Sequence, residues 1–169
     1  FCDMFTLPRR AAACGVAART LSYYSCDYGQ VHFLCLNTQD VDLTATGSTA
    51  TCLKADLTAT STRWLIAYFH HPPYSKGTHD SDDPLDSEGR MKDMREVFLP
   101  ILESGGVDLV LTGHSHCYER SFLLDGHYDV STTLTPSMIL DLGDGRPSGD
   151  GAYVKPTGLL GANEGAVYV

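Results

Sequence analysis

Two short apolar runs that each lead into histidine constrain the fold of this chain most strongly. The first spans residues 65–69 and precedes His70, and the second spans residues 107–111 and lies just before His114. Short runs of apolar residues that are closed by Gly or Pro indicate strands buried on both faces. Residues 91–103 lie between them and carry apolar side chains at helical spacing. Strand, helix and strand in this order predict parallel strands and an α/β fold.

The histidines that follow these strands are candidate metal ligands. The carboxyl ends of parallel strands meet at one edge of a sheet, where α/β proteins bind their ligands. His114 and His116 are separated by one residue, so both side chains leave the same side of a locally extended chain. Imidazole is the commonest protein ligand for zinc and similar metals. We therefore expect His70, His114 and His116 to bind metal.

The remaining segments are less regular. We expect a strand at residues 31–36, a helix at 51–60, a long loop at 75–90, a hairpin that pairs 121–124 with 127–130, and a Gly- and Asp-rich loop at 141–165. Pro100 is expected to kink the helix at 91–103 because proline lacks an N–H group. A long loop beside a site is more often functional than idle, which draws attention to residues 75–90.

Composition excludes several classes of protein. The chain has 169 residues, enough for one domain, and its net charge of −9 argues against nucleic acid as a non-specific partner. The negative net charge does not exclude a small phosphorylated substrate, since a bound metal supplies local positive charge. No apolar run is long enough to span a membrane.

The six cysteines form no CxxC pair, which excludes zinc-finger and thioredoxin motifs. A Cys2–Cys14 disulfide is one option, and Cys35 is expected to be buried.

The histidine motifs carry a family resemblance. His70-His71-Pro72-Pro73-Tyr74, followed by Gly113-His114-Ser115-His116 and Tyr118-Glu119-Arg120, resembles the C-terminal half of the calcineurin-like metallophosphoesterases. Residues 24–33 are similar to the Tyr-Ser-x-Asp-x-Gly-x-x-His-Phe strand of the purple-acid-phosphatase branch, and Trp64 also fits that branch. The oligomeric state cannot be read from these motifs.

The resemblance implies a fold, a site and a cofactor. The fold would be part of a four-layer α/β/β/α sandwich around two metal ions, which in this family are Fe, Zn or Mn. His70 and His114 would bind one ion and His116 the other. His79, in the loop after the first motif, would contact the phosphate or protonate the leaving group. A secreted or extracytoplasmic location is also favoured by the resemblance.

Three family motifs that supply further ligands, Asp-x-Gly, Gly-Asp-x-x-Tyr and Gly-Asn-His, do not precede His70. We therefore expect residues 1–169 to be the C-terminal portion of one metallophosphoesterase domain, truncated at both ends. Similar triplets occur in order within residues 141–164, but only residues 144–148 separate the first two. A helical crossover between strands needs at least about ten residues, so we interpret this segment as a surface loop.

The favoured function is hydrolysis of phosphomonoesters by a metal-activated water, with weak or no activity in this chain alone. One alternative is a non-catalytic fragment that binds phosphate or metal, with a single structural zinc on His70, His114 and His116, with or without Cys117. Another is a phosphodiesterase on the same scaffold. Four other residues receive minor roles: His71 lies beside the site, His32 is structural, His127 lies on a surface turn, and Asp108 is one candidate to orient the imidazoles.

Overall fold

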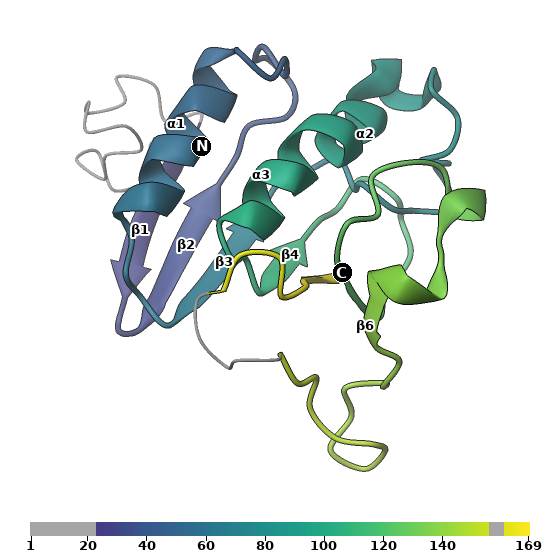
Figure 1. Ribbon diagram of the computed structural model, residues 1–169. Coiled ribbons are helices and arrows are strands. Elements are labelled where there is room, and N and C mark those ends of the chain that lie inside the picture. Colours follow the sequence, from purple (N-terminus) through teal and green to yellow (C-terminus); the bar gives the residue numbers. More distant parts are fainter. Residues whose placement is uncertain (1–22, 156–160) are drawn as a thin grey trace.

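The computed structural model describes residues 23–155 and 161–169 (Figure 1). The Cys2–Cys14 option lies outside these residues. The strands and α-helices are, in chain order, β1 (Tyr24–Tyr28), β2 (Val31–Cys35), α1 (Ser48–Ala59), β3 (Trp64–Tyr68), α2 (Arg90–Asp93), α3 (Leu99–Ser104), β4 (Leu109–Leu111), β5 (Leu123–Leu124), β6 (Ile139–Asp141) and β7 (Val167–Tyr168). Short helical turns occupy Asp86–Gly89, Met94–Phe98, Ser131–Thr133 and Pro136–Met138. No described helix is long and apolar enough to cross a membrane.

Five of the described strands form one sheet in the order β1-β2-β3-β4-β7. β1 and β2 form an antiparallel hairpin, whereas β2, β3, β4 and β7 are parallel to one another. The connection from β3 to β4 runs through α2 and α3, as the sequence predicts. The α/β class is therefore confirmed. Parallel pairing also brings the ends of β3 and β4 to the same edge.

The helices cover one face of this sheet. Figure 1 shows α1 and α3 side by side over β2, β3 and β4. Leu34, Leu65 and Val110 point to this face and are at most 2% exposed. Burial of an aliphatic side chain contributes about 1.5–3 kcal/mol, so this layer is the main source of stability. The described residues thus form a helix layer packed on one face of a mainly parallel sheet.

The other face of the sheet carries apolar side chains that are only partly covered. Trp64 is 47% exposed, and a groove of about 540 Å³ runs along Val31, Ile66 and Leu109. Cys35 lies on this face and is half-buried, so the expectation of a buried Cys35 is wrong. The reason is that α1 and α3 pack against the alternate residues of β2.

The predicted hairpin at residues 121–130 is also wrong. β5 pairs with β6, not with residues 127–130, which contain no strand. The turn at Gly126 exists, with φ +76°, but the Gly126 N–H donates to the buried carboxylate of Glu103 at the end of α3. Tyr128 donates to the same carboxylate. These bonds draw the chain toward the helix layer and away from β5.

The helix predicted at residues 91–103 is present but irregular. A π-helical turn, Met94–Phe98, separates α2 from α3, and Pro100 stands in the first turn of α3. Pro100 cannot donate a hydrogen bond back into the preceding turn, and wider π-type bonding accommodates that loss.

Candidate metal centre

The loops after β3 and β4 run side by side beyond the edge of the sheet. The Phe69 N–H donates to the Leu111 carbonyl, and the Gly113 N–H donates to the His70 carbonyl, both at 3.1 Å. Parallel pairing thus continues past the strands and fixes His70 next to His114. A Cβ at Gly113 would lie 3.6 Å from the His70 ring, an ordinary van der Waals contact, so this approach does not depend on glycine. The sequence prediction that these two histidines meet is in line with this geometry.

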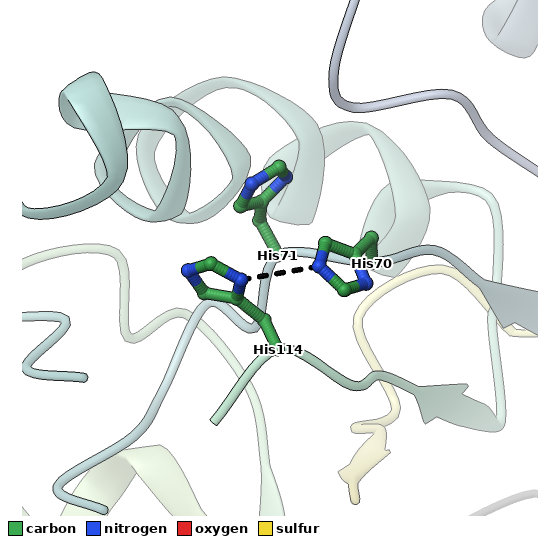
Figure 2. A group of neighbouring side chains, drawn as sticks. All are labelled: His70, His71 and His114. Atoms are coloured by element: carbon green, nitrogen blue, oxygen red, sulfur yellow. Dashed lines mark hydrogen bonds between the residues drawn. The ribbon is translucent and has the colours of Figure 1, made fainter. Parts of the chain in front are cut away.

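Three imidazoles converge at this edge. Figure 2 shows the rings of His70 and His114 facing each other, with the His71 ring beside them. His114 Nδ1 lies 3.1 Å from His70 Nε2. The centroids of the His71 and His114 rings are 4.7 Å apart. One nitrogen from each of the three rings falls within 4.8 Å of the others.

This donor set fits a transition metal. Three nitrogens at such spacing can bind one tetrahedral zinc or a similar ion with a position left for water. His71 is 3% exposed, and its Nδ1 is held 2.7 Å from Thr38 Oγ1. Burial, with the neighbouring His114 and His70, lowers the pKa of His71 to about 4. Burial and the nearby histidines also lower the pKa of His114. Neutral rings are the form that binds metal.

A second group lies on the other side of His114. His79, Asp86 and His114 bring one ligand atom each within 4.8 Å of the others. The His79 ring stacks on the His114 ring, and His79 Nδ1 lies 2.8 Å from Asp86 Oδ1. Hydrogen bonds from Asp80 N–H and Ser87 lower the pKa of Asp86 to about 2, so this carboxyl is ionised at neutral pH. Ser87 Oγ lies 2.6 Å from His114 Nε2.

Left-handed backbone marks the residues around His114. His114 has φ +65°, Ser87 φ +54° and Glu88 φ +58°. Each non-glycine residue in this region costs about 1–2 kcal/mol. Such strain clusters at functional sites, where the surrounding structure holds it in place. Here it brings the Ser87 hydroxyl up to the His114 ring.

His116 takes a different position from the other histidines. Its side chain is exposed, and its backbone N–H donates to Thr78 Oγ1 at 3.0 Å. Its ring belongs to neither ligand group of the described residues. The assignment of His116 to a second metal therefore stays a prediction. Asp86 is the only described carboxylate in these two groups.

Polar contacts hold the loop that carries His114 and His116. Glu119 accepts hydrogen bonds from Ser75 Oγ at 2.8 Å and from the Lys76 N–H at 2.9 Å. Ser115 Oγ lies 2.6 Å from Ser75 Oγ. Exposed Cys117 points its thiol at Glu119, 3.3 Å away, and is in neither ligand group of the described residues. A pocket of about 270 Å³ lies along this loop.

Two minor expectations are wrong. Asp108 accepts from the Leu65 N–H and from Lys155 Nζ, because it precedes β4, whereas the histidines follow it. His127 is 3% exposed instead of lying on the surface, and its ring stacks on Tyr74 with centroids 5.5 Å apart. The structural role of His32 agrees with its hydrogen bonds to Asp27 and Asp56.

Sequence reasoning missed three residues of the site. It placed His71 beside the site, although its adjacency to His70 was a usable signal. Nothing in the pattern of the 75–90 loop distinguishes Asp86 from the other acidic residues there. Ser87 was equally hidden, because its left-handed backbone is unusual for a residue that is not glycine.

Comparison with known proteins places the chain in a family. The calcineurin-like phosphoesterase model matches residues 2–118. Purple acid phosphatase 23 of Arabidopsis thaliana is 32% identical over 126 residues, which cover 73% of this chain and 25% of the relative. Purple acid phosphatase 18 of the same plant is 35% identical over 105 residues, covering 59% and 22%. The chain thus spans about a quarter of the length of these relatives.

Among solved structures, the purple acid phosphatase PPD1 from yellow lupin (Lupinus luteus) seeds covers 60% of this chain and 18% of its own. Its TM-score is 0.47 and its sequence identity is 19%. The family match spans most of the chain, including the strand ends that carry His70 and His114. The chain belongs to the calcineurin-like phosphoesterase family and is similar to the purple acid phosphatases within it.

Proposed function

We propose that this chain supplies the histidine part of a metal-dependent phosphoesterase site that acts on small phosphomonoesters. The observation that carries the proposal is the 3.1 Å approach of His70 Nε2 and His114 Nδ1 from neighbouring strand ends. The family match supports the reaction class. The curated relatives named above are purple acid phosphatases, which supports the phosphomonoester substrate.

Different histidines of the chain are assigned to metal binding and to proton transfer. Metal ions at such a site lower the pKa of water and offset the charge of the phosphate. His70 and His114 would hold one ion, with His71 as a neighbouring nitrogen donor, and His116 would contribute to a second. His79 protonates the leaving oxygen, since its Nδ1 is turned to Asp86 and its Nε2 is left for the substrate. A general acid of this kind contributes about 10²–10⁴-fold in rate.

The carboxylate ligands of the second ion come from outside the described residues. Asp86 is the only carboxylate in the two ligand groups of the described chain, and it is bonded to His79. We propose on this ground that residues 1–169 form the C-terminal portion of the metallophosphoesterase domain, and that turnover by this chain alone is weak or absent.

The single-zinc alternative is favoured by one observation. His70 and His114 form a three-nitrogen group with His71, in place of the expected His116, and such a group can hold one zinc without the ligands of a second ion. One relative carries the name probable inactive purple acid phosphatase 9 and is 32% identical over 109 residues. A non-catalytic metal-binding role is therefore the second candidate.

Metal stoichiometry and turnover separate the two candidates. The whole protein that carries this chain is titrated with Zn²⁺, Mn²⁺ and Fe³⁺, and hydrolysis of p-nitrophenyl phosphate is followed. Two ions per chain with turnover that His114→Ala abolishes support the phosphoesterase. One tight zinc with no turnover on p-nitrophenyl phosphate or bis-p-nitrophenyl phosphate contradicts it. A strong preference for the diester contradicts the phosphomonoester assignment alone.

We also propose an extracytoplasmic location. Cys52 forms a disulfide bond in the structure, and disulfides persist mainly in oxidising compartments. Alkylation of the protein purified from its natural compartment, with and without reductant, tests this: Cys52 should react only after reduction.

A further inference from the structure

Two consecutive residues of the 75–90 loop contact both histidines to which the chemistry is assigned. Asp86 Oδ1 lies 2.8 Å from His79 Nδ1. Ser87 donates its hydroxyl hydrogen to the same Asp86 oxygen, at 2.7 Å. The Ser87 oxygen lies 2.6 Å from His114 Nε2. A continuous chain of hydrogen bonds therefore joins the two rings through one dipeptide.

The direction of these bonds fixes where each ring carries its hydrogen. An ionised carboxylate only accepts, so His79 donates from Nδ1 and Ser87 donates its O–H. Because the Ser87 hydrogen is used on Asp86, its oxygen accepts from His114 Nε2–H. The neutral His114 ring then has its lone pair on Nδ1, which faces His70. The neutral His79 ring has its lone pair on Nε2, so this nitrogen must first take up a proton, with Asp86 bonding the resulting imidazolium at Nδ1, before it can donate to a leaving oxygen.

We propose that Asp86 and Ser87 are positioning residues that fix the ring tautomers of His79 and His114 through one shared hydrogen-bond chain. The assignment rests on the proposed function for its meaning, since it presents His114 Nδ1 to the metal and His79 Nε2 to the substrate. Partners of this kind orient the imidazoles that bind metals and raise their basicity. The left-handed backbone of Ser87 and Glu88 shapes the loop at this contact.

A competing use of the same atoms is a second cation site. His79, Asp86 and His114 bring their ligand atoms within 4.8 Å. Occupation of that site by a cation requires Ser87 to release His114 Nε2 and requires that nitrogen to lose its hydrogen. The hydrogen-bond chain favours the positioning role, and the experiment separates the two.

The first measurement is the tautomeric state of each ring in the metal-free chain. Long-range ¹H–¹⁵N correlation spectra at about pH 8, where an ordinary histidine is neutral, distinguish protonated from bare ring nitrogens. We expect His114 protonated at Nε2 and His79 at Nδ1. Ser87→Ala should turn His114 into a mixture of tautomers, and Asp86→Asn should do so for His79. Asp82→Asn is the matched control, because Asp82 bonds Ser131 and Lys76, not a histidine.

The second measurement is Zn²⁺ titration of the same variants. Ser87→Ala should weaken zinc binding about 10- to 100-fold with unchanged stoichiometry, as loss of an orienting partner does. Loss of one zinc equivalent in Asp86→Asn overturns the proposal in favour of the cation site. His114 protonated at Nδ1, or a tautomer insensitive to Ser87→Ala, also overturns it. Absence of turnover in the whole protein overturns the proposed function and leaves the ring tautomers untouched.

Discussion

The imidazole of His79 stacks on the imidazole of His114, with ring centroids 3.9 Å apart and planes inclined by 21°. The residue assigned to proton transfer thus lies against a residue assigned to metal binding. His79 comes from the loop after β3 and His114 from the loop after β4. Proton transfer by His79 and metal binding by His114 can still be tested separately, because they depend on nitrogens of different rings.

His79→Gln should therefore reduce turnover without removing metal. We expect a loss of about 10²–10⁴-fold in kcat of the whole protein, because general acid catalysis is absent. The zinc affinity of His79→Gln should stay within about threefold of that of the unsubstituted protein, whereas His114→Ala should no longer bind the ion. Isothermal titration with Zn²⁺ measures the affinity, and hydrolysis of p-nitrophenyl phosphate by the same samples measures turnover. Equal loss of zinc in the two variants would contradict the division of roles.

Thr38→Val should weaken metal binding from outside the histidine group. Thr38 Oγ1 holds His71 Nδ1 at 2.7 Å in a buried position, and valine keeps the shape but not the hydrogen bond. Without this hydrogen bond the His71 ring is less well oriented, and we expect zinc affinity to fall about 10- to 100-fold. Competition with a chromophoric chelator measures this. Thr44→Val is a suitable control, because the Thr44 side chain bonds Asp42 and not a histidine. An unchanged affinity in Thr38→Val would remove His71 from the metal site.

Tyr168→Phe should destabilise the fold more than Tyr153→Phe. Tyr168 is 4% exposed and donates its hydroxyl to Oε1 of the buried Glu103, so its loss leaves that oxygen without this donor, while Gly126 and Tyr128 still donate to Oε2. The expected cost is about 1–3 kcal/mol in the free energy of unfolding. Tyr153 bonds the Ser121 carbonyl at 3.2 Å near the surface, and its variant should cost less than about 1 kcal/mol. Urea unfolding of both variants gives the comparison.

Asp56→Asn should destabilise the chain chiefly at acidic pH. Burial opposes the charge on His32, but hydrogen bonds to Asp56 and Asp27 outweigh it and raise the pKa of His32. A raised histidine pKa adds stability that is complete below the unfolded pKa and is lost as pH rises through the folded pKa. At about pH 5.5 the variant should lose about 1.5–3 kcal/mol, and at about pH 9 clearly less.

Asp27→Asn is the matched control for this pH dependence. The Asp27 side chain is 62% exposed, against 9% for Asp56, so solvent screens its interaction with His32. Its loss should cost less than about 1 kcal/mol at either pH. Equal, pH-independent losses in both variants would show that His32 carries no charge in the folded chain.

Gly77→Ala should push the 75–90 loop away from the 113–117 loop. A Cβ at this residue would lie 2.2 Å from the Cys117 thiol and 2.5 Å from Ser115 Oγ. Relief of that overlap requires movement of the 113–117 loop, at a cost of about 1–3 kcal/mol. Thermal unfolding and zinc titration measure the effect. The double variant Gly77→Ala/Cys117→Ala should recover part of the loss, because the overlap with Ser115 Oγ remains, and no recovery at all would place the strain elsewhere.

The sequence predicted those parts of the molecule that depend on local pattern. Apolar runs and their spacing were enough for β3, β4 and the helix between them, although only the helix-covered face of these strands is fully buried, contrary to the expected burial on both faces. Parallel pairing then implied the meeting of His70 and His114. The hairpin at residues 121–130 failed because a distant carboxylate, Glu103, redirects the chain there. The pairing of Asp86 with His79 depends on a loop conformation that composition does not encode.

The direction of the strands has a practical consequence for engineering this protein. β2, β3 and β4 all point their carboxyl ends toward the histidines, so the turns that enter them lie at the far end of the sheet. A strand such as β3 has five residues, and at about 3.3 Å per residue that puts roughly 16 Å between the segment before Trp64 and His70. A reporter peptide or surface tether inserted at residues 61–63 should leave phosphate access and metal loading undisturbed.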